Sequence, residues 1–147
     1  MKKFELTSEF VTFLGKKLFR IKALISFGNV EEGELGGYVE KEENLSNDGN
    51  AWVAGDARVY GNAEVFGNAW VYGDADYATV HGFGSEYRTT TFFRTKAGDV
   101  GVRCGCFYGT LEEFRAKVKE RHGETKTAKE YLMVADLMEF RFSKEEA

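Results

Sequence analysis

The sequence predicts a mainly β protein in which a short left-handed parallel β-helix lies between an N-terminal β cap and a C-terminal ββαα unit. The first observation is a six-residue repeat that runs from Asn50 as NAWVAG, DARVYG, NAEVFG and NAWVYG, and that fails after DAD at Tyr77. The second is that each repeat has a Val, a Gly two positions later, then Asn or Asp, then Ala. A short fixed period of this kind is typical of a solenoid, in which each coil stacks on the next.

The spacing of apolar residues gives the extent of the predicted β-helix. Three repeats would complete one triangular coil, so residues eighteen positions apart would stack. This spacing aligns Leu35 with Val53 and Val71, which extends the β-helix back to residue 34. We therefore divide the chain into a cap over residues 1–33, a β-helix over 34–76 and a C-terminal unit over 77–147. Gly and Asn or Asp at the corners tolerate the positive φ angles of tight turns.

The segments that flank the repeats are expected to cap the ends of the β-helix, because two coils bury too little apolar surface alone. In the N-terminal cap, KFEL, EFVTFL and KKLFRIKALISF are apolar and β-prone, and Gly15-Lys16-Lys17 predicts a turn. In the C-terminal unit, TTTFFRTK and VGVRCGCF flank Lys96-Ala97-Gly98-Asp99, which is a hairpin signal.

Two helices are predicted to follow this hairpin. Thr110 and Thr127 each precede a Glu by three positions, which is the capping-box spacing that begins a helix. Gly123 is expected to end the first helix. The second helix is expected to reach about Phe142 and to turn one apolar face inward, made of Tyr131, Val134, Leu137 or Met138, and Phe140.

Composition argues against several classes of protein. The net charge of −4 disfavours nucleic-acid polymers as partners. No apolar run reaches about 18 residues, so no membrane partner is expected. Two His and two Cys are too few for a zinc centre, and no phosphate-loop or dinucleotide motif is present, so neither a metal nor a cofactor is predicted. Cys104 and Cys106 give no disulfide framework, which favours a reducing, cytoplasmic compartment.

Aromatic side chains outside the repeat core indicate a binding surface. They make up 15% of the chain, and rings beside a few cations are a common way to hold nucleobases and phosphates. Trp52 and Trp70 occupy equivalent repeat positions and are expected to form an outward stripe, which could also be an oligomer contact or a surface that the C-terminal unit covers. Arg94 and Arg103 are expected to align across the hairpin. The candidate ligand-binding residues are Trp52, Trp70, Tyr87, Arg88, Arg94, Arg103 and Tyr108.

The stretch GELGGYVEKEENLS followed by NAWVAGDARVYG resembles hexapeptide-repeat proteins of phages and prophages. The ending VRCGCFYGTLEEFRAKVKERHG with KEYLMVADLMEF resembles the ending of the same group, so the resemblance covers nearly the whole chain. The group is mostly uncharacterised. The resemblance therefore implies a viral protein in the cytoplasm of an infected or lysogenic host, assembled as a homotrimer, rather than a defined activity.

The function we expect is that of a non-enzymatic phage accessory protein that counters host defence by sequestering a small nucleotide-like or anionic ligand between subunits. Three alternatives stay open. An acyltransferase-like enzyme would use His81, just beyond the repeats, as a general base. A protein-contact inhibitor would present carboxylates such as Glu42 and Glu43 to a host nuclease. A structural oligomer would assemble with no small-molecule partner.

Overall fold

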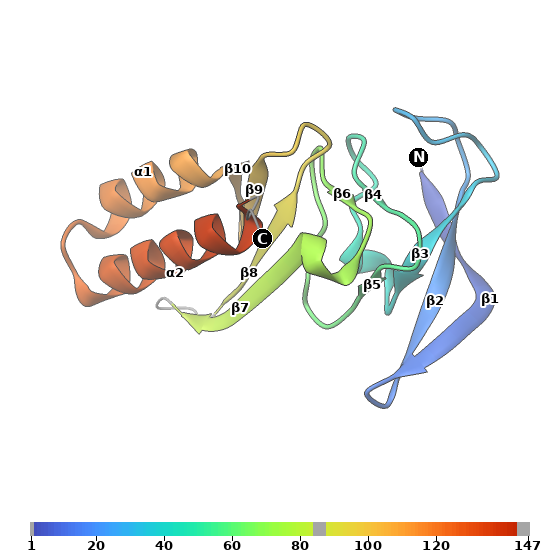
Figure 1. The fold of residues 1–147 in the computed structure, drawn as a ribbon, viewed down its shortest axis with the longest axis horizontal. Helices are drawn as coiled ribbons and strands as arrows, with labels where there is room; N and C mark the ends of the chain where they lie inside the picture. The colour runs from blue at the N-terminus through green and yellow to red at the C-terminus, as the bar shows by residue number, and fades with distance from the viewer. Residues whose placement is uncertain (1, 84–87, 144–147) are drawn as a thin grey trace.

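Two sheets lie at either end of the repeat segment, and two helices cover the outer face of the second sheet (Figure 1). This computed structural model describes residues 2–83 and 88–143. The elements follow one another along the molecule, so the N-terminal hairpin and the helices are at opposite ends (Figure 1). The repeats therefore contact a sheet on each side.

The N-terminal sheet has four strands in the order β1-β2-β3-β5. β1 (Phe4–Phe13) and β2 (Lys16–Ala23) form an antiparallel hairpin, as the cap sequence predicts, but its turn is Leu14-Gly15. β3 (Leu35–Val39) pairs antiparallel with β2, and β5 (Arg58–Val59) pairs parallel with β3. Leu14 has a φ of +51°, so a leucine occupies a left-handed backbone conformation that favours glycine.

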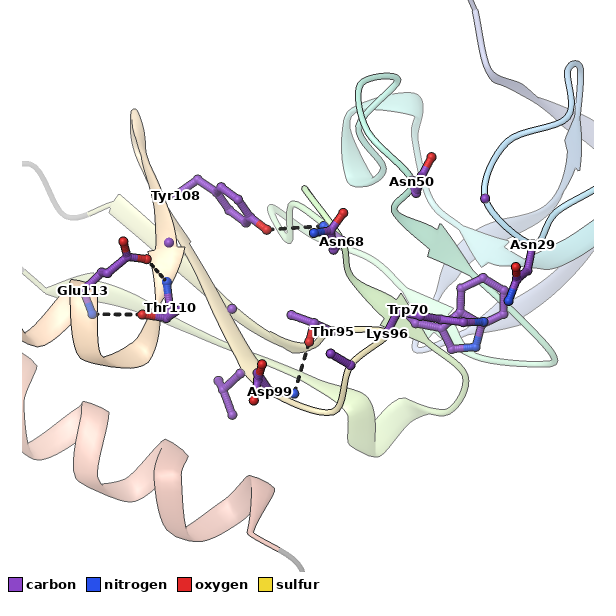
Figure 2. A pocket seen from close by; sticks show the side chains of 15 residues that line it. Asn29, Asn50, Asn68, Trp70, Thr95, Lys96, Asp99, Tyr108, Thr110 and Glu113 are labelled. Atoms are coloured by element: carbon purple, nitrogen blue, oxygen red, sulfur yellow. Dashed lines mark hydrogen bonds between the residues drawn. The ribbon is translucent and has the colours of Figure 1, made fainter.

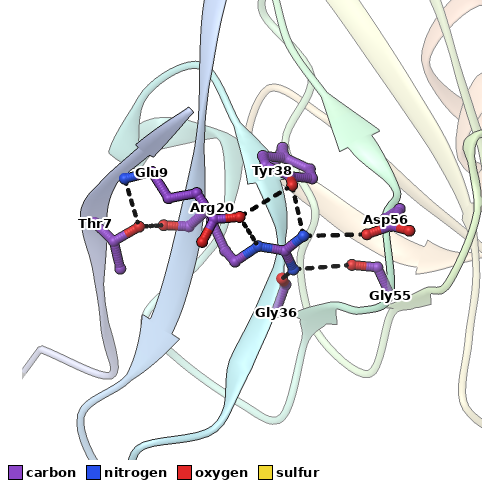
Figure 3. Close-up of polar contacts among 7 residues, drawn as sticks. All are labelled: Thr7, Glu9, Arg20, Gly36, Tyr38, Gly55 and Asp56. Atoms are coloured by element: carbon purple, nitrogen blue, oxygen red, sulfur yellow. Dashed lines mark hydrogen bonds and ion pairs between the residues drawn. The ribbon is translucent and has the colours of Figure 1, made fainter. Parts of the chain in front are cut away.

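Arg20 in β2 ties this sheet to the repeats (Figure 3). Its guanidinium donates to the Glu9 carboxylate at 2.9 Å, to the Tyr38 hydroxyl at 2.5 Å and to the Asp56 carboxylate at 3.1 Å. It also donates to the carbonyl of Gly36 at 2.6 Å and lies over the Tyr38 ring. Because these partners come from β1, β3 and a repeat turn, the guanidinium clamps three segments together.

The repeat segment does not form the left-handed parallel β-helix that the sequence predicts, and that prediction is wrong. The two larger sheets are mixed or antiparallel, and none of the described sheets closes into a solenoid. Within residues 2–83 and 88–143, parallel pairing besides that of β3 with β5 is limited to β4 (Trp52–Val53) with β6 (Trp70–Val71) and to one bridge between Leu45 and Val65. Strands of two residues make too few ladder hydrogen bonds to extend a parallel sheet.

The eighteen-residue spacing also holds for only part of the segment. Val53 pairs with Val71, as expected, but Val39 pairs with Val59, which lies twenty positions on. The two additional residues fall in the stretch that precedes the regular six-residue pattern. Leu35, the expected first member of the Val53 ladder, is exposed. The eighteen-residue spacing thus does not reach back to Leu35.

The second sheet is antiparallel, in the order β10-β9-β8-β7. β8 (Arg88–Arg94) and β9 (Val100–Cys104) form the hairpin predicted around Lys96-Ala97-Gly98-Asp99. β7 (Tyr77–Phe83) and β10 (Phe107–Thr110) add one strand on each side, so the predicted ββαα unit has four strands instead of two. Short 3-10 turns, η1 (Glu42–Asn44) and η2 (Asp74–Asp76), lie in the repeat segment.

α1 (Leu111–His122) begins at the predicted capping box. The Thr110 hydroxyl accepts from the Glu113 backbone N–H at 3.1 Å, and the Glu113 carboxylate accepts from the Thr110 N–H at 2.8 Å. The helix ends at Gly123, as predicted. α2 (Lys126–Phe142) begins after Thr125 rather than Thr127, because the Thr125 hydroxyl accepts from the first turn at 3.2 Å.

The buried face of α2 differs in part from the predicted one. Tyr131 and Met138 are buried and Val134 is partly buried, as expected, but Leu137 and Phe140 are exposed. The remaining buried positions are Ala128, Ala135 and Phe142. The helix therefore presents a narrower face to the sheet, and small alanines allow it to pack closely.

Two apolar cores meet at strand β8. The first lies among the N-terminal sheet and the repeats, and includes the four fully buried repeat valines Val53, Val59, Val65 and Val71. The second lies between the second sheet and the helices. Successive side chains of a strand point to opposite faces, so Phe93 enters the first core and Phe92 enters the second. The second sheet is thereby held between the repeats and the helices.

Candidate functional site

A pocket lies where the repeats meet the turn between β8 and β9 and strand β10 (Figure 2). Its volume is about 580 Å³. The repeats and the loop before β3 contribute one wall, and the β8–β9 turn, β10 and the start of α1 contribute the other. The side chains with aromatic rings, amides or a cation to offer a ligand are Asn29, Asn50, Asn68, Trp70, Lys96 and Tyr108.

The β8–β9 turn holds a lysine against a tryptophan. A bridge between Ala69 and Thr95 and a hydrogen bond from the Lys96 backbone N–H to the Asn68 carbonyl, at 2.9 Å, dock this turn on the last full repeat. The Lys96 ammonium thereby lies 3.6 Å from the centroid of the Trp70 ring. Lys96 makes no ion pair with any residue that the structure describes. Its charge is therefore available to a ligand.

Tyr108 in β10 lines another part of the pocket. Its ring stacks on Phe93 with centroids 6.2 Å apart and meets Phe66 edge-on at 5.0 Å. Its hydroxyl accepts a hydrogen bond from the Asn68 backbone N–H at 3.3 Å, which ties β10 to the repeats. Gly67 lies beneath it, and a methyl group on Gly67 would overlap the Tyr108 hydroxyl and ring. Tyr108 nevertheless stays 38% exposed, so its ring can contact a ligand.

Three asparagines form the rim of the pocket (Figure 2). Asn29, Asn50 and Asn68 each follow a glycine with positive φ, so each has the same place in a tight turn. The pairing of β4 with β6 stacks the last two turns, and Gly28 packs against the Asn50 side chain. Within residues 2–83 and 88–143, the three side-chain amides have no hydrogen-bond partner. Each amide therefore offers a carbonyl acceptor and two N–H donors to a ligand.

Charge is distributed unevenly around the pocket. Figure 2 shows Lys96 beside Trp70, whereas Glu113 lies on the far side beside Thr110. One oxygen of Glu113 is occupied by the Thr110 N–H of the capping box. Asp99 is exposed and lies at the end of the β8–β9 turn. A ligand in the pocket would therefore meet a cation over an indole on one side and the Glu113 carboxylate on the other, with Asp99 at the end of the turn that carries Lys96.

Trp52, the first predicted site residue, does not reach the pocket. Its side chain is fully buried in the first core, and its ring meets Phe27 at 5.4 Å. The indole N–H has no hydrogen-bond partner among the described residues. Trp70 has the same place in its repeat but is only partly buried. The two indoles therefore do not form the outward stripe that the sequence predicts.

The two predicted hairpin arginines are also engaged elsewhere. Arg94 pairs with Asp76 at 3.1 Å and Arg103 pairs with Glu64 at 3.4 Å. They are not opposite each other, because the register of β8 and β9 places Arg103 beside Thr91. Both arginines tie the second sheet to the repeats and do not contribute to the pocket.

Three other predicted residues complete the set. Tyr87 lies outside the described residues, and of Arg88 only its place at the start of β8 is described. His81 in β7 has its Nδ1 2.9 Å from the Thr89 hydroxyl and lines a separate cavity of about 550 Å³. Of the seven predicted ligand-binding residues, Trp70 and Tyr108 are thus the two that the structure brings to the pocket.

No group of three or more His, Cys, Asp or Glu side chains in the described part of the chain is arranged to hold a metal ion. Neither of the two described helices has the length and apolar character that a membrane crossing needs.

Sequence reasoning missed Lys96 and the three asparagines. The segment Lys96-Ala97-Gly98-Asp99 was interpreted only as a turn, and the asparagines only as turn formers. One signal could have found part of this set. Asn50 and Asn68 share a repeat position two residues before a tryptophan, so any stacking of the repeats places them on one edge beside Trp70.

No protein-family model matches this chain, and no curated protein matches it.

Proposed function

We propose that the protein binds a small nucleotide-like ligand in the pocket between the repeats and the β8–β9 turn, without chemical conversion. The single observation that carries this proposal is the Lys96 ammonium, held 3.6 Å from the centroid of the Trp70 ring with no carboxylate partner in the described chain. A cation fixed on an aromatic face is ready to pair with an anion, because the ring restricts the side chain before the ligand arrives.

The neutral part of such a ligand also has matching groups. The rings of Trp70 and Tyr108 can pack against a flat heterocycle, and base–aromatic stacking contributes about 1–3 kcal/mol. The amides on the rim and the carboxylate of Asp99 can pair with the donors and acceptors on the edge of a base. A phosphate beside Lys96 and a base towards the rim would use both kinds of group.

Sequestration is the mode of action that this lining supports best. The pocket is lined by aromatic, amide, hydroxyl and acidic side chains, one lysine and several glycines, with no histidine or cysteine among its described residues. Its carboxylate, lysine and tyrosine groups could transfer protons, but the described lining has no histidine, cysteine or serine to form the usual pair of nucleophile and base. The ligand would therefore be held and released unchanged.

Calorimetric titration with AMP, GMP, CMP and UMP at fixed ionic strength tests this proposal. At least one mononucleotide should bind to the wild-type protein. Lys96→Met keeps an apolar stem over Trp70 but removes the charge, and it should weaken that binding about 10- to 100-fold, because a hydrogen bond to a charged group contributes about 1.5–3 kcal/mol. The parent nucleoside, which lacks the phosphate, should bind both proteins equally.

Lys129→Met is the matched control, since Lys129 is exposed on α2, away from the pocket. It makes the same change in net charge and should leave binding unaltered. The proposal fails if none of the four mononucleotides binds, or if Lys96→Met and Lys129→Met have equal effects.

We further propose the biological setting that the resemblance implies: a homotrimeric phage or prophage accessory protein that captures a host signal. Exposed apolar side chains, among them Tyr72 in the repeats and Leu137 and Phe140 on α2, support self-association. Native mass spectrometry of protein purified from bacterial cells would test this setting. A trimer that carries one fixed additional mass per chain is expected, and a bare monomer would contradict it.

The enzyme alternative now depends on His81 alone, because its analogy to acyltransferases required a β-helix. What favours it is the short contact between His81 Nδ1 and the Thr89 hydroxyl, at 2.9 Å, in a cavity that Lys41 also lines. A hydroxyl that orients an imidazole is a feature of general bases. His81→Ala should abolish any acyl transfer to a small amine, and it should leave mononucleotide binding unchanged if the two cavities act independently.

A further inference from the structure

Lys3 is a buried lysine that lies next to the pocket wall. Its side chain is 1% exposed, and its ammonium donates to the Ala51 carbonyl at 2.6 Å and, more weakly, to the Gly49 carbonyl at 3.4 Å. These two carbonyls belong to the residues on either side of Asn50. The same ammonium lies 4.6 Å from the centroid of Phe27, which begins the turn that carries Asn29. One cation thus contacts both turns that supply these rim asparagines.

This contact comes at a cost in stability. Burial disfavours the charged form and lowers the pKa of Lys3 to about 8, although the nearby Asp48 carboxylate acts in the opposite direction. A methionine would fill similar space with no such penalty, and replacing a buried charge by an apolar group is often neutral or stabilising. A costly buried charge beside a pocket is a feature of functional sites.

We propose that Lys3 is a positioning residue for the pocket, and that its ammonium fixes the two turns that present Asn29 and Asn50 to the ligand. A charged donor makes hydrogen bonds about twice as strong as a neutral one, so loss of the proton loosens both turns together. Asn68 is held separately, by the contact of its backbone N–H with Tyr108, and keeps its place. The ligand-binding part of this inference rests on the proposed function.

Few other charges act on Lys3. Asp48, in the turn that precedes Asn50, is the carboxylate that influences it. The neighbouring Lys2 is paired with Glu42. The Lys3 backbone N–H is bound by the Asn47 side-chain oxygen at 2.9 Å, which holds the residue in place whether or not its amine is protonated. A change around pH 8 in this region that Lys3→Met removes would therefore report Lys3 itself.

Two measurements, one without ligand, test the inference. In a series of ¹H–¹⁵N spectra from pH 6.5 to 9, the backbone amides of Asn29 and Asn50 should shift together with a midpoint near pH 8. Asn62, which follows a positive-φ glycine in another repeat, is the internal control and should not show this midpoint. Lys3→Met should remove the transition from Asn29 and Asn50 and should fold, since it removes a buried charge.

The second measurement is the affinity for AMP and for adenosine at pH 7 and pH 9. In the wild-type protein both should bind three- to tenfold more weakly at pH 9, and Lys3→Met should bind both weakly at either pH. Equal loss for the neutral nucleoside separates positioning from simple attraction of the phosphate, which would weaken AMP alone. That AMP-only result, or Asn29 and Asn50 amides that do not titrate near pH 8, would overturn the inference.

The two proposals fail in different ways. If no nucleotide binds but the amides titrate as expected, the proposed function fails, and the role of Lys3 in fixing the two turns stands. If AMP binds through Lys96 but its pH dependence is the same in wild type and Lys3→Met, the proposed function stands and the role of Lys3 is refuted.

Discussion

Gly67→Ala should be far more destabilising than the same change at the equivalent position of the preceding repeat. Gly67 has a φ of +65°, and a methyl group there would overlap the hydroxyl and ring of Tyr108. Gly61 has a φ of +68°, and a methyl group there would have no neighbour within 4 Å. The two glycines thus share the backbone strain of a left-handed residue and differ only in the clash with Tyr108.

The expected magnitude follows from the contacts that Tyr108 would lose. An alanine in the left-handed region costs about 1–2 kcal/mol, and this is the whole expected effect at Gly61. At Gly67, displacement of Tyr108 also removes ring contacts with Phe66 and Phe93, worth about 0.5–1.5 kcal/mol each. Its hydrogen bond from the Asn68 N–H adds about 0.5–1.5 kcal/mol. Gly67→Ala should therefore cost about 2.5–6.5 kcal/mol in total.

Equilibrium unfolding in urea, followed by tryptophan fluorescence, measures both free energies. The decisive comparison repeats the two substitutions in a Tyr108→Ala background, where the ring is already absent. There, Gly67→Ala and Gly61→Ala should cost the same. If the two differ by less than about 0.5 kcal/mol in the wild-type background, Tyr108 does not depend on Gly67 and this account of the pocket wall is wrong.

Three further outcomes are expected. Leu14→Asn should stabilise the protein by about 1 kcal/mol in thermal unfolding, because asparagine tolerates the φ of +51° at this position. The control is Leu35→Asn, which also replaces an exposed leucine and should give no gain in stability. Between about pH 8 and 10.5 the unfolded chain binds a proton at Lys3 that the folded chain lacks. The free energy of unfolding of the wild type should therefore rise over this range, relative to that of Lys3→Met, by up to about 3 kcal/mol. An equal pH dependence of the two proteins would refute this. Arg115→Met should lower the free energy of unfolding by about 1–2 kcal/mol, because it leaves three carboxylates on α1 and α2 without their shared partner. High salt screens these ion pairs and should reduce the loss. A loss that salt does not change would contradict this.

Local features were the part of the fold that the sequence predicted well. The repeat period correctly identified the inward valines such as Val53 and Val71. The capping-box spacing at Thr110 and the turn signal at Lys96-Ala97-Gly98-Asp99 correctly identified the start of α1 and the β8–β9 hairpin. These depend on residues close in the chain, whose periodicity and turn chemistry can be read directly. The prediction of the global arrangement was wrong, because a repeat period shows only that the repeats are alike. It does not show how many residues of each repeat will pair with the next.

The residues that line the pocket were only partly predicted, for a related reason. Trp52 and Trp70 have the same neighbours in sequence, yet only Trp70 lines the pocket. The two tryptophans differ in the non-repeating segment that covers them. The turn that begins at Phe27 packs against Trp52, and Lys96 lies over Trp70. Contacts of this kind join segments far apart in the chain and leave no local signal. Lys3, buried against residues more than forty positions away, is an extreme case.

The placement of Phe92 and Phe93 on opposite faces of β8 has a consequence for how this chain can be cut or rebuilt. A truncation that removed the helices would leave Phe92 and Val102 facing water, while the same strand still had to hold Phe93 among the repeats. The part of the chain before β8 and the part after it therefore depend on the same strand. Neither part should fold by itself when it is moved into another protein. Insertions have a better chance at the tip of the β1–β2 hairpin, where Gly15 meets no neighbouring atoms and added residues would disturb neither core.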